Sequence, residues 1–363
     1  MKFPELAYIS WVKALPPVEI NLARSGVDYC PASLLPLQFS DIVTTLPVKY
    51  GYQPLSEAIA ERYGVTTGQV FPLSGGTSYA NWIACTAVLD GSEESTEVIV
   101  EKPTYEPLLA VPQALGHRIR RLDRRMEDCY AIDLDRFESL VSSNTRLAIV
   151  SNLHNPSGAR IDAITLQAMA RILERVNAYL LVDEVYLECL FRDRPISCVH
   201  AGDNIITTNS LTKAYGLDGL RAGWILGPAP LITRAGRIHD LMSINSVAPG
   251  ELMALAAFRH LDAIDRRAHE FLDPNLEIFR TFTEKESRLT AIVPVGGTVL
   301  FARLPSGLDC ERFTTHLVER YSTLVVPGRF FESAGHIRVG FGCDSALLQR
   351  GLRNLSRALD DLV

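Results

Sequence analysis

The sequence predicts an α/β protein: a large domain with a mostly parallel central sheet flanked by helices, and a smaller α+β domain. Between residues 74 and 227, short runs of branched apolar residues alternate with amphipathic stretches, as in crossover units that connect parallel strands. After Pro249 the pattern changes to long helical stretches followed by a few short strands. We therefore expect residues 40–248 to form the large domain, and residues 1–39 and 249–363 the small one.

The individual elements follow from local patterns. The first forty residues look irregular and are expected to pack on the small domain without joining the main sheet. Residues 162–177 predict a helix, because apolar residues recur at helical spacing after an aspartate suited to cap the first turn. Residues 251–285 predict one long helix that links the domains. In the large domain, strands are expected at 97–101, 147–152, 179–183, 205–209 and 223–227. In the small domain, strands are expected at 291–293, 298–304, 323–326 and 336–341, and helices at 310–320 and from residue 344.

Composition favours an enzyme that acts on small molecules. The net charge of −6 is spread along the 363 residues, which argues against a nucleic-acid partner. The seven cysteines are scattered without CxxC spacing, so neither a disulfide framework nor a metal site is predicted. No stretch is long and apolar enough to span a bilayer, and the first residues lack the apolar core of a signal peptide. We expect a cytoplasmic protein without a membrane partner.

The segment 209–224, NSLTKAYGLDGLRAGW, places Lys213 in a turn rich in small and hydroxyl residues. Burial and nearby cations lower the pKa of such a lysine, which makes its amine a nucleophile suited to imine formation. Ser210, Thr212 and Arg221 offer two hydroxyl groups and a planar guanidinium to a phosphate. A lone lysine here would be better explained as a surface residue, so the other motifs decide.

This segment resembles the lysine motif of fold-type I pyridoxal-phosphate enzymes, and of class I and II aminotransferases in particular. The resemblance implies that pyridoxal 5'-phosphate is attached to Lys213. The segment LVDEVY, residues 181–186, is similar to a second family motif. It implies that Asp183 pairs with the pyridine nitrogen of the cofactor and that Tyr186 hydrogen-bonds its phenolic oxygen. For Asp183 alone, a turn or helix-cap carboxylate is the alternative.

Two further segments resemble the family's cofactor-binding loops. SGGTSYAN, residues 74–81, precedes a helical stretch, and a helix N-terminus with a glycine-rich loop offers backbone amides to a phosphate. The resemblance assigns this role to Gly76, Thr77 and Ser78, although a simple capped helix start is the alternative. Tyr105 follows the strand predicted at 97–101, where the family has an aromatic ring that stacks on the pyridine. Its alternative is an ordinary core tyrosine.

The substrate anchor is expected in two more segments. SNLHNPSG, residues 151–158, ends in a turn at the carboxyl edge of the sheet, and the resemblance implies that Asn155 meets the cofactor's phenolic oxygen and the substrate carboxylate. HIRVGFG, residues 336–342, places Arg338 within a short strand where it needs a partner. The resemblance implies that this partner is the α-carboxylate of an amino acid, which Arg338 binds through two parallel hydrogen bonds. A structural salt bridge is the alternative.

The resemblance implies an aminotransferase that exchanges the amino group between an L-amino acid and a 2-oxo acid. It also implies a homodimer, in which Tyr50 or Tyr52 reaches the cofactor of the partner subunit. Catalysis would rest on Lys213, Asp183 and Tyr186. The alternative is other chemistry on the same fold, namely β/γ-elimination or cyclisation or oxidation of an arginine derivative. The segments LTKAYGLDGLRAGW and LVVPGRFF are similar to those of capreomycidine synthase-type enzymes, which favours that alternative.

Overall fold

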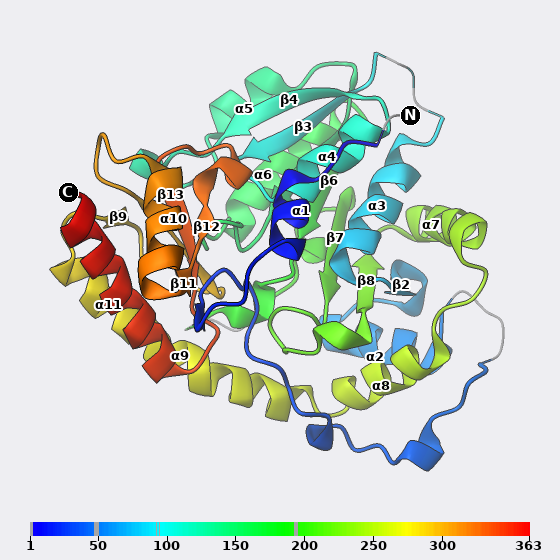
Figure 1. The fold of residues 1–363 in the computed structure, drawn as a ribbon. Coiled ribbons are helices and arrows are strands. Elements are labelled where there is room, and N and C mark those ends of the chain that lie inside the picture. The colour runs from blue at the N-terminus through cyan, green and yellow to red at the C-terminus, as the bar shows by residue number, and fades with distance from the viewer. Residues whose placement is uncertain (1–2, 47–50, 92, 94, 192–194) are drawn as a thin grey trace.

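A seven-stranded sheet forms the centre of the larger part of the molecule, here called the large lobe (Figure 1). The computed structural model describes residues 3–46, 51–91, 93, 95–191 and 195–363. Strand order is β2-β8-β7-β6-β5-β3-β4, and β8 alone runs against its neighbours, so the mostly parallel sheet is confirmed. The strands are β2 (Val70–Ser74), β3 (Glu97–Lys102), β4 (Arg118–Asp123), β5 (Thr145–Ser151), β6 (Tyr179–Asp183), β7 (Ile205–Ser210) and β8 (Ala222–Leu226).

Helices cover both faces of this sheet because side chains alternate along its strands. On β3, Val98 and Val100 pack into one apolar cluster, whereas Ile99 between them packs into another. The first cluster includes α3 (Gly76–Leu89), α4 (Glu106–Ala114) and α7 (Ala229–Met242), and the second includes α5 (Leu134–Leu140) and α6 (Ala163–Glu174). Asp162 caps α6 as predicted, because its Oδ1 accepts a hydrogen bond of 2.7 Å from the amide of Thr165.

A four-stranded antiparallel sheet with strand order β12-β13-β10-β9 forms the small lobe. Two amphipathic helices bury their apolar faces in its core. The elements are β9 (Thr290–Ala291), β10 (Val299–Arg303), α10 (Cys310–Tyr321), β11 (Thr323–Leu324), β12 (Val326–Pro327), β13 (His336–Gly340) and α11 (Ser345–Leu362). The strand predicted at 323–326 is therefore divided, and β11 pairs with the N-terminal segment instead of this sheet.

The N-terminal segment is more ordered than the sequence suggested. Helix α1 (Ala7–Lys13) packs between the two lobes, and β1 (Ile20–Asn21) pairs in parallel with β11. The carboxylate of Glu106 accepts the backbone amides of Ala7 and Tyr8, each at 2.8 Å, which fixes the start of α1 against α4. The expectation of an irregular segment was thus wrong for these residues.

The long helix predicted at 251–285 is two helices, α8 (Ala248–Phe258) and α9 (Leu261–Lys285). The chain bends at Arg259 and His260, where no glycine or proline marks a break. Helix α8 packs against β8 and α2 (Gln53–Tyr63) of the large lobe, and α9 continues to α11 of the small lobe. The division of the chain at residue 248 stays a prediction.

In the described part of the chain, no helix is long and apolar enough to cross a membrane.

The order of the strands brings polar side chains to one edge of the large sheet. Because β5, β6 and β7 are parallel, their last residues Ser151, Asp183 and Ser210 lie at the same edge. Strand β8 runs the other way, so its first residues, directly after Arg221, lie at that edge too. This edge is where the candidate site forms.

Glu101 and Arg124 form an ion pair behind this edge in which neither side chain is exposed, with 2.6 Å between Oε2 and Nη1. Removal of one partner leaves an uncompensated buried charge, so Glu101→Ala should lower the free energy of unfolding by about 3–5 kcal/mol. Urea denaturation measures this change. The exposed pair of Arg175 with Glu138 is the control, since Arg175→Ala should cost about 0–1 kcal/mol. Equal losses in the two variants would contradict the prediction.

Candidate active site

A cavity of about 270 Å³ opens at this sheet edge, between the large lobe and helix α1. Its lining combines an amine, a carboxylate, phenols and hydroxyl groups, a set of convergent polar groups typical of a small-molecule site. Nine predicted site residues line it: Thr77, Ser78, Tyr105, Asn155, Asp183, Tyr186, Thr212, Lys213 and Arg221. Three others, Gly76, Ser210 and Arg338, are absent from the lining, but each contacts a residue that lines it.

Lys213 lies in the turn after β7 and reaches into the cavity. Its Nζ donates a hydrogen bond of 3.0 Å to Ser25 Oγ, on the N-terminal segment. Burial, with a further contribution from the Arg338 cation, lowers the pKa of Lys213 to about 8. A substantial fraction of the amine is therefore neutral near pH 8, as a nucleophile or a base requires.

Asp183 ends β6 with its carboxylate at the cavity wall. Its Oδ2 accepts from Asn81 Nδ2 at 2.8 Å, and its Oδ1 accepts from the amide of Val185 at 3.1 Å. Burial raises the pKa of Asp183 to about 6, and these two hydrogen bonds oppose the rise. The group is thus mainly a carboxylate at pH 7.5 and suited to face a cation in the cavity.

Two tyrosines close the aromatic side of the cavity. Burial raises the pKa of both Tyr105 and Tyr186, so both phenols stay protonated at neutral pH. The Tyr186 hydroxyl lies beside Ser25 but makes no hydrogen bond of normal geometry with the described residues. The Tyr105 ring meets the Tyr8 ring edge-on, with 6.0 Å between centroids. A donor and an aromatic face are therefore both available to a ligand.

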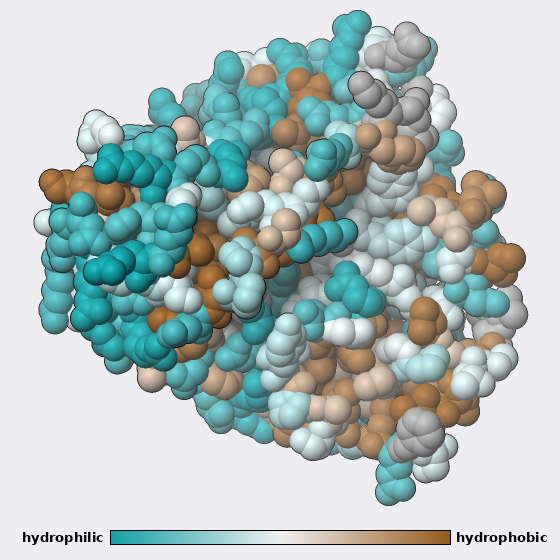
Figure 2. Space-filling view, viewed as in Figure 1, coloured by the Kyte–Doolittle hydropathy of each residue, from teal (hydrophilic) through white to brown (hydrophobic). Residues whose placement is uncertain are grey.

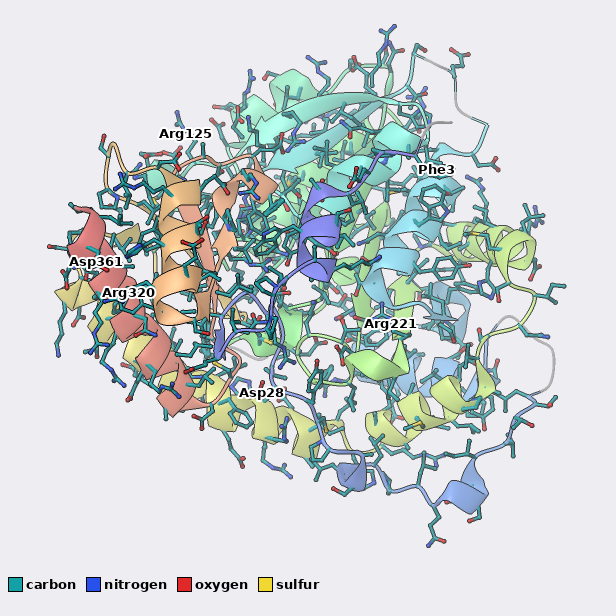
Figure 3. The ribbon with its side chains drawn as sticks, viewed as in Figure 1. Phe3, Asp28, Arg125, Arg221, Arg320 and Asp361 are labelled. Atoms are coloured by element: carbon teal, nitrogen blue, oxygen red, sulfur yellow. The ribbon has the colours of Figure 1, made fainter. Side chains whose placement is uncertain are left out.

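Three linked hydroxyl groups and a guanidinium surround the other end. Thr77 Oγ1 donates to Ser210 Oγ at 2.7 Å, and Ser210 Oγ lies 2.7 Å from Thr212 Oγ1. Arg221, labelled in Figure 3 on the segment before β8, donates from Nη2 to the carbonyl of Gly75 at 2.8 Å. A Cβ at Gly76, where φ is +70°, would lie 2.8 Å from the same Arg221 nitrogen, so only glycine fits here. Ser210 supports the neighbouring hydroxyls from behind.

Arg338 on β13 is buried against Asn155 and the N-terminal segment. Its guanidinium donates to Asn155 Oδ1 at 3.1 Å, to the Tyr8 hydroxyl at 2.9 Å and to the carbonyl of Ala23 at 3.1 Å. All three acceptors are neutral, so in the described residues the salt-bridge alternative finds no support. A guanidinium has five N–H donors, and the Nε donor has no partner here. Arg338 is therefore a buried cation with hydrogen-bonding capacity left for an anion.

Sequence reasoning did not single out Tyr8 or Asp218, two polar residues that the structure brings to the cavity. Tyr8 and Asp218 line it, and Ser25 accepts the hydrogen bond from Lys213. Asp218 belongs to the segment 209–224 that contains Lys213. An acidic residue so close to the predicted cofactor lysine was a signal that could have identified it. Nothing in the sequence around Tyr8 indicates that α1 packs on this site.

Of the two tyrosines expected to reach a partner subunit, the structure describes only one. Tyr50 lies outside the described residues. Tyr52 precedes α2 and packs, half-buried, against the main apolar cluster. Its predicted contact with a partner subunit stays a prediction.

The arrangement fits a phosphorylated pyridine aldehyde. The amine of Lys213 suits the aldehyde, the carboxylate of Asp183 suits a protonated ring nitrogen, and the free Tyr186 hydroxyl suits a phenolic oxygen. The Thr77, Ser210 and Thr212 hydroxyls, with the guanidinium of Arg221, form a polar end suited to phosphate. No group of three or more metal-ligating side chains occurs among the described residues.

Known proteins agree with this reading. The family model for aminotransferase class I and II matches residues 41–355. Capreomycidine synthase from Streptomyces vinaceus is 32% identical over 85% of this chain and 79% of its own length. Arginine–pyruvate transaminase from Pseudomonas aeruginosa is 27% identical over 86% of this chain and 82% of its own length.

A solved structure agrees as well. The crystal structure of a PLP-dependent aminotransferase from Streptococcus suis superimposes with a TM-score of 0.93 at 26% identity, covering 100% of this chain and 99% of that one. With the family model matching most of the chain, the protein belongs to the pyridoxal-phosphate-dependent class I and II aminotransferase family.

Proposed function

We propose that the Lys213 cavity exchanges the amino group between an L-amino acid and a 2-oxo acid. One observation carries this proposal: a buried lysine with a pKa lowered to about 8 shares one cavity with a buried carboxylate, and a buried arginine lies behind it. When bound, pyridoxal 5'-phosphate supplies an electron-withdrawing ring that weakens the bonds at the substrate's α-carbon. The polypeptide supplies the binding groups, the orientation and the proton transfers.

Lys213 has two roles in this proposal. Its Nζ would hold the cofactor covalently, and as a free amine the same nitrogen would take the α-proton of the substrate and return it. The lowered pKa supports both roles, since a protonated amine can neither attack nor accept a proton. Ser25 Oγ supports them too, because it accepts a hydrogen bond from Nζ and so orients the amine.

The other site residues hold the two ligands. Asp183 pairs with the ring nitrogen, Tyr186 donates to the phenolic oxygen, and Tyr105 offers its ring face. Arg338 and Asn155 take the substrate carboxylate, and their mutual hydrogen bond of 3.1 Å keeps the two groups together. The phosphate is assigned to the following set: Gly76, Thr77, Ser78, Ser210, Thr212 and Arg221.

A cyclisation or elimination reaction is the second candidate. The 32% identity to capreomycidine synthase favours it, because that name describes a synthase and not a transaminase. The same lysine, aspartate and arginine serve proton removal in either reaction. The two candidates differ in where the amino group ends: on the cofactor in a transamination, and in the product or as ammonia in the others.

Lys213→Ala should lower turnover about 100- to 10,000-fold, because the base that moves the α-proton is lost. Release of a 2-oxo acid and the matching change in cofactor absorbance measure the transfer. Lys285→Ala, on the exposed face of α9, is the control and should keep parental activity. Retained turnover in Lys213→Ala, or a reduced and digested Lys213 peptide without cofactor, would overturn the assignment.

We propose further that the amino donor carries a cationic side chain of the guanidinium class. A second cavity of about 370 Å³ adjoins the first and shares Tyr8, Lys213 and Asp218 with it. The Asp218 carboxylate lies near enough to Lys213 to raise the pKa of that amine. Arg24, which also lines the second cavity, is already paired with Asp28 at 3.1 Å. The arginine-directed transaminase among the relatives supports the same class.

Asp218→Asn should raise the KM for L-arginine about tenfold, because a charge-assisted hydrogen bond to the guanidinium is weakened. The KM for the neutral donor L-norleucine should stay within about twofold. Steady-state kinetics with both donors, and with Asp135→Asn on exposed α5 as the charge-matched control, measures this difference. An equal change for both donors would place Asp218 outside side-chain recognition.

We also propose a homodimer. Four large apolar side chains lie exposed at the end of α7 and in the loop to α8: Leu241, Met242, Ile244 and Val247, between 52% and 88% exposed. Figure 2 shows hydrophobic residues gathered over this side of the molecule. A patch of this kind marks an interface. Sedimentation equilibrium should give twice the 40.1 kDa mass of the chain, and Leu241→Asp with Ile244→Asp should shift it toward the monomer. A monomeric parent would refute the proposal.

A cytoplasmic location is proposed as well. All seven cysteines are unpaired, which suits a compartment that keeps thiols reduced. Cell fractionation tests it.

A further inference from the structure

Beside Asp183, a buried amide connects the neighbouring strands β6 and β7 of the large sheet. Asn81 lies in the second turn of α3 and is 3% exposed. Its Nδ2 donates to Asp183 Oδ2 at 2.8 Å, and its Oδ1 accepts from Thr208 Oγ1 at 2.6 Å. Thr208 on β7 is the direct neighbour of Asp183 on β6 in the parallel pairing. Both residues are buried. The amide therefore has a fixed partner on each side.

The orientation of this amide depends on the charge of Asp183. With Nδ2 toward the carboxylate, both ends of the amide are satisfied only if Asp183 accepts and Thr208 donates. With the amide reversed, its Oδ1 would face the Asp183 oxygen, and only a protonated Asp183 could satisfy it. Because Thr208 donates to the amide oxygen, the ionised form of Asp183 matches the arrangement. The Asn81 amide and the backbone amide of Val185 both donate to Asp183, which favours its ionised form because a carboxylate is the stronger acceptor.

We propose that Asn81, oriented by Thr208, is a positioning residue that keeps Asp183 ionised and its carboxylate directed at the ring nitrogen of the cofactor. The inference rests on the proposed cofactor contact of Asp183. It goes further, because it assigns to Asn81 and Thr208, both neutral, the control of the protonation state of Asp183.

Few groups around Asp183 other than Asn81 can influence its protonation state. Burial pushes the pKa of Asp183 up to about 6; the Asn81 hydrogen bond is the largest opposing influence, ahead of the Val185 amide and the Lys213 charge. The titratable groups facing Asp183 are Lys213, Tyr105 and Tyr186, and both tyrosines are neutral at physiological pH. The paired positions on β5 and β7 are Ser151 and Thr208, which carry no charge.

The test is a pH titration of the Asp183 carboxyl in the cofactor-free protein. Carboxyl carbons of aspartate are labelled with ¹³C, and the Asp183 signal is assigned by its loss in Asp183→Asn. In the parent protein the carboxyl should titrate near pH 6. In Asn81→Leu the donor is gone, so the ionised form is less favoured and the pKa should rise by about one unit or more. This readout does not depend on cofactor or turnover.

The cofactor-loaded protein gives the functional arm. If Asp183 is protonated it cannot pair with a pyridinium, so in Asn81→Leu the acid limb of the pH–kcat profile should move to higher pH. For a rise of one pKa unit, the dissociation constant of pyridoxal 5'-phosphate at pH 6.5 should rise about threefold, with KM for the amino donor nearly unchanged. A raised Asp183 pKa without these changes would keep the Asn81 inference for the free protein and refute the proposed cofactor contact of Asp183.

Threonines 207 and 208 provide a matched pair of variants. Thr208→Val removes the donor that orients the amide and should shift the Asp183 pKa in the same direction as Asn81→Leu, whereas Thr208→Ser should restore it. Thr207 on the same strand is equally buried, but its hydroxyl has no hydrogen-bond partner among the described residues, so Thr207→Val should change nothing.

Folding does not limit the test. If Asn81→Leu alone is unstable because the Thr208 hydroxyl is left buried and unpaired, the combined Asn81→Leu, Thr208→Val variant removes both polar groups. An unchanged Asp183 pKa in a folded Asn81→Leu or combined variant, or equal shifts in Thr207→Val and Thr208→Val, would overturn the inference.

Discussion

The candidate site depends on one constraint of topology: five neighbouring strands of the large sheet run in parallel, so their polar last residues meet at one edge. The single reversed strand, β8, strengthens the effect, because it brings the segment with Arg221 to the edge at its beginning. Lys213 lies in the connection from β7 to β8, and the sheet fixes both ends of that connection. Polar residues that are scattered over the sequence of the large lobe are brought to one edge by this arrangement.

Burial favours the neutral form of each group, which the proposed chemistry uses at Lys213 and Tyr186 but not at Asp183. Desolvation disfavours whichever form is charged, so it lowers the pKa of Lys213 and raises those of Asp183 and Tyr186. A neutral amine and a neutral phenol are useful as they are, but a neutral Asp183 is not. Only the aspartate therefore needs added hydrogen-bond donors, and it is the group that receives them, from Asn81 and Val185.

Local pattern predicted five of the seven strands of the large sheet, because each depends on residues close in sequence, whereas β2 and β4 were not predicted. The strand 179–183 has the predicted bounds, and Asp183 follows from being its last residue. The failures depend on distant partners. Helix α1 is fixed by Glu106, up to 99 residues away, and the role of Asn81 requires Thr208, 127 residues away. The break between α8 and α9 has no local signal, since tertiary packing on both lobes decides where each helix ends.

The small lobe completes the site from the opposite side, and its contribution is tied to the N-terminal segment. Arg338 comes from β13, yet its guanidinium is held by Tyr8 of α1 and by the carbonyl of Ala23. Tyr8 also packs edge-on against Tyr105 of the large lobe and against Phe330 of the small one. The proposed carboxylate ligand of Arg338 would therefore bind beside a phenol that contacts both lobes. In that proposal the packing of α1 and the orientation of Arg338 depend on each other through the Tyr8 hydroxyl group.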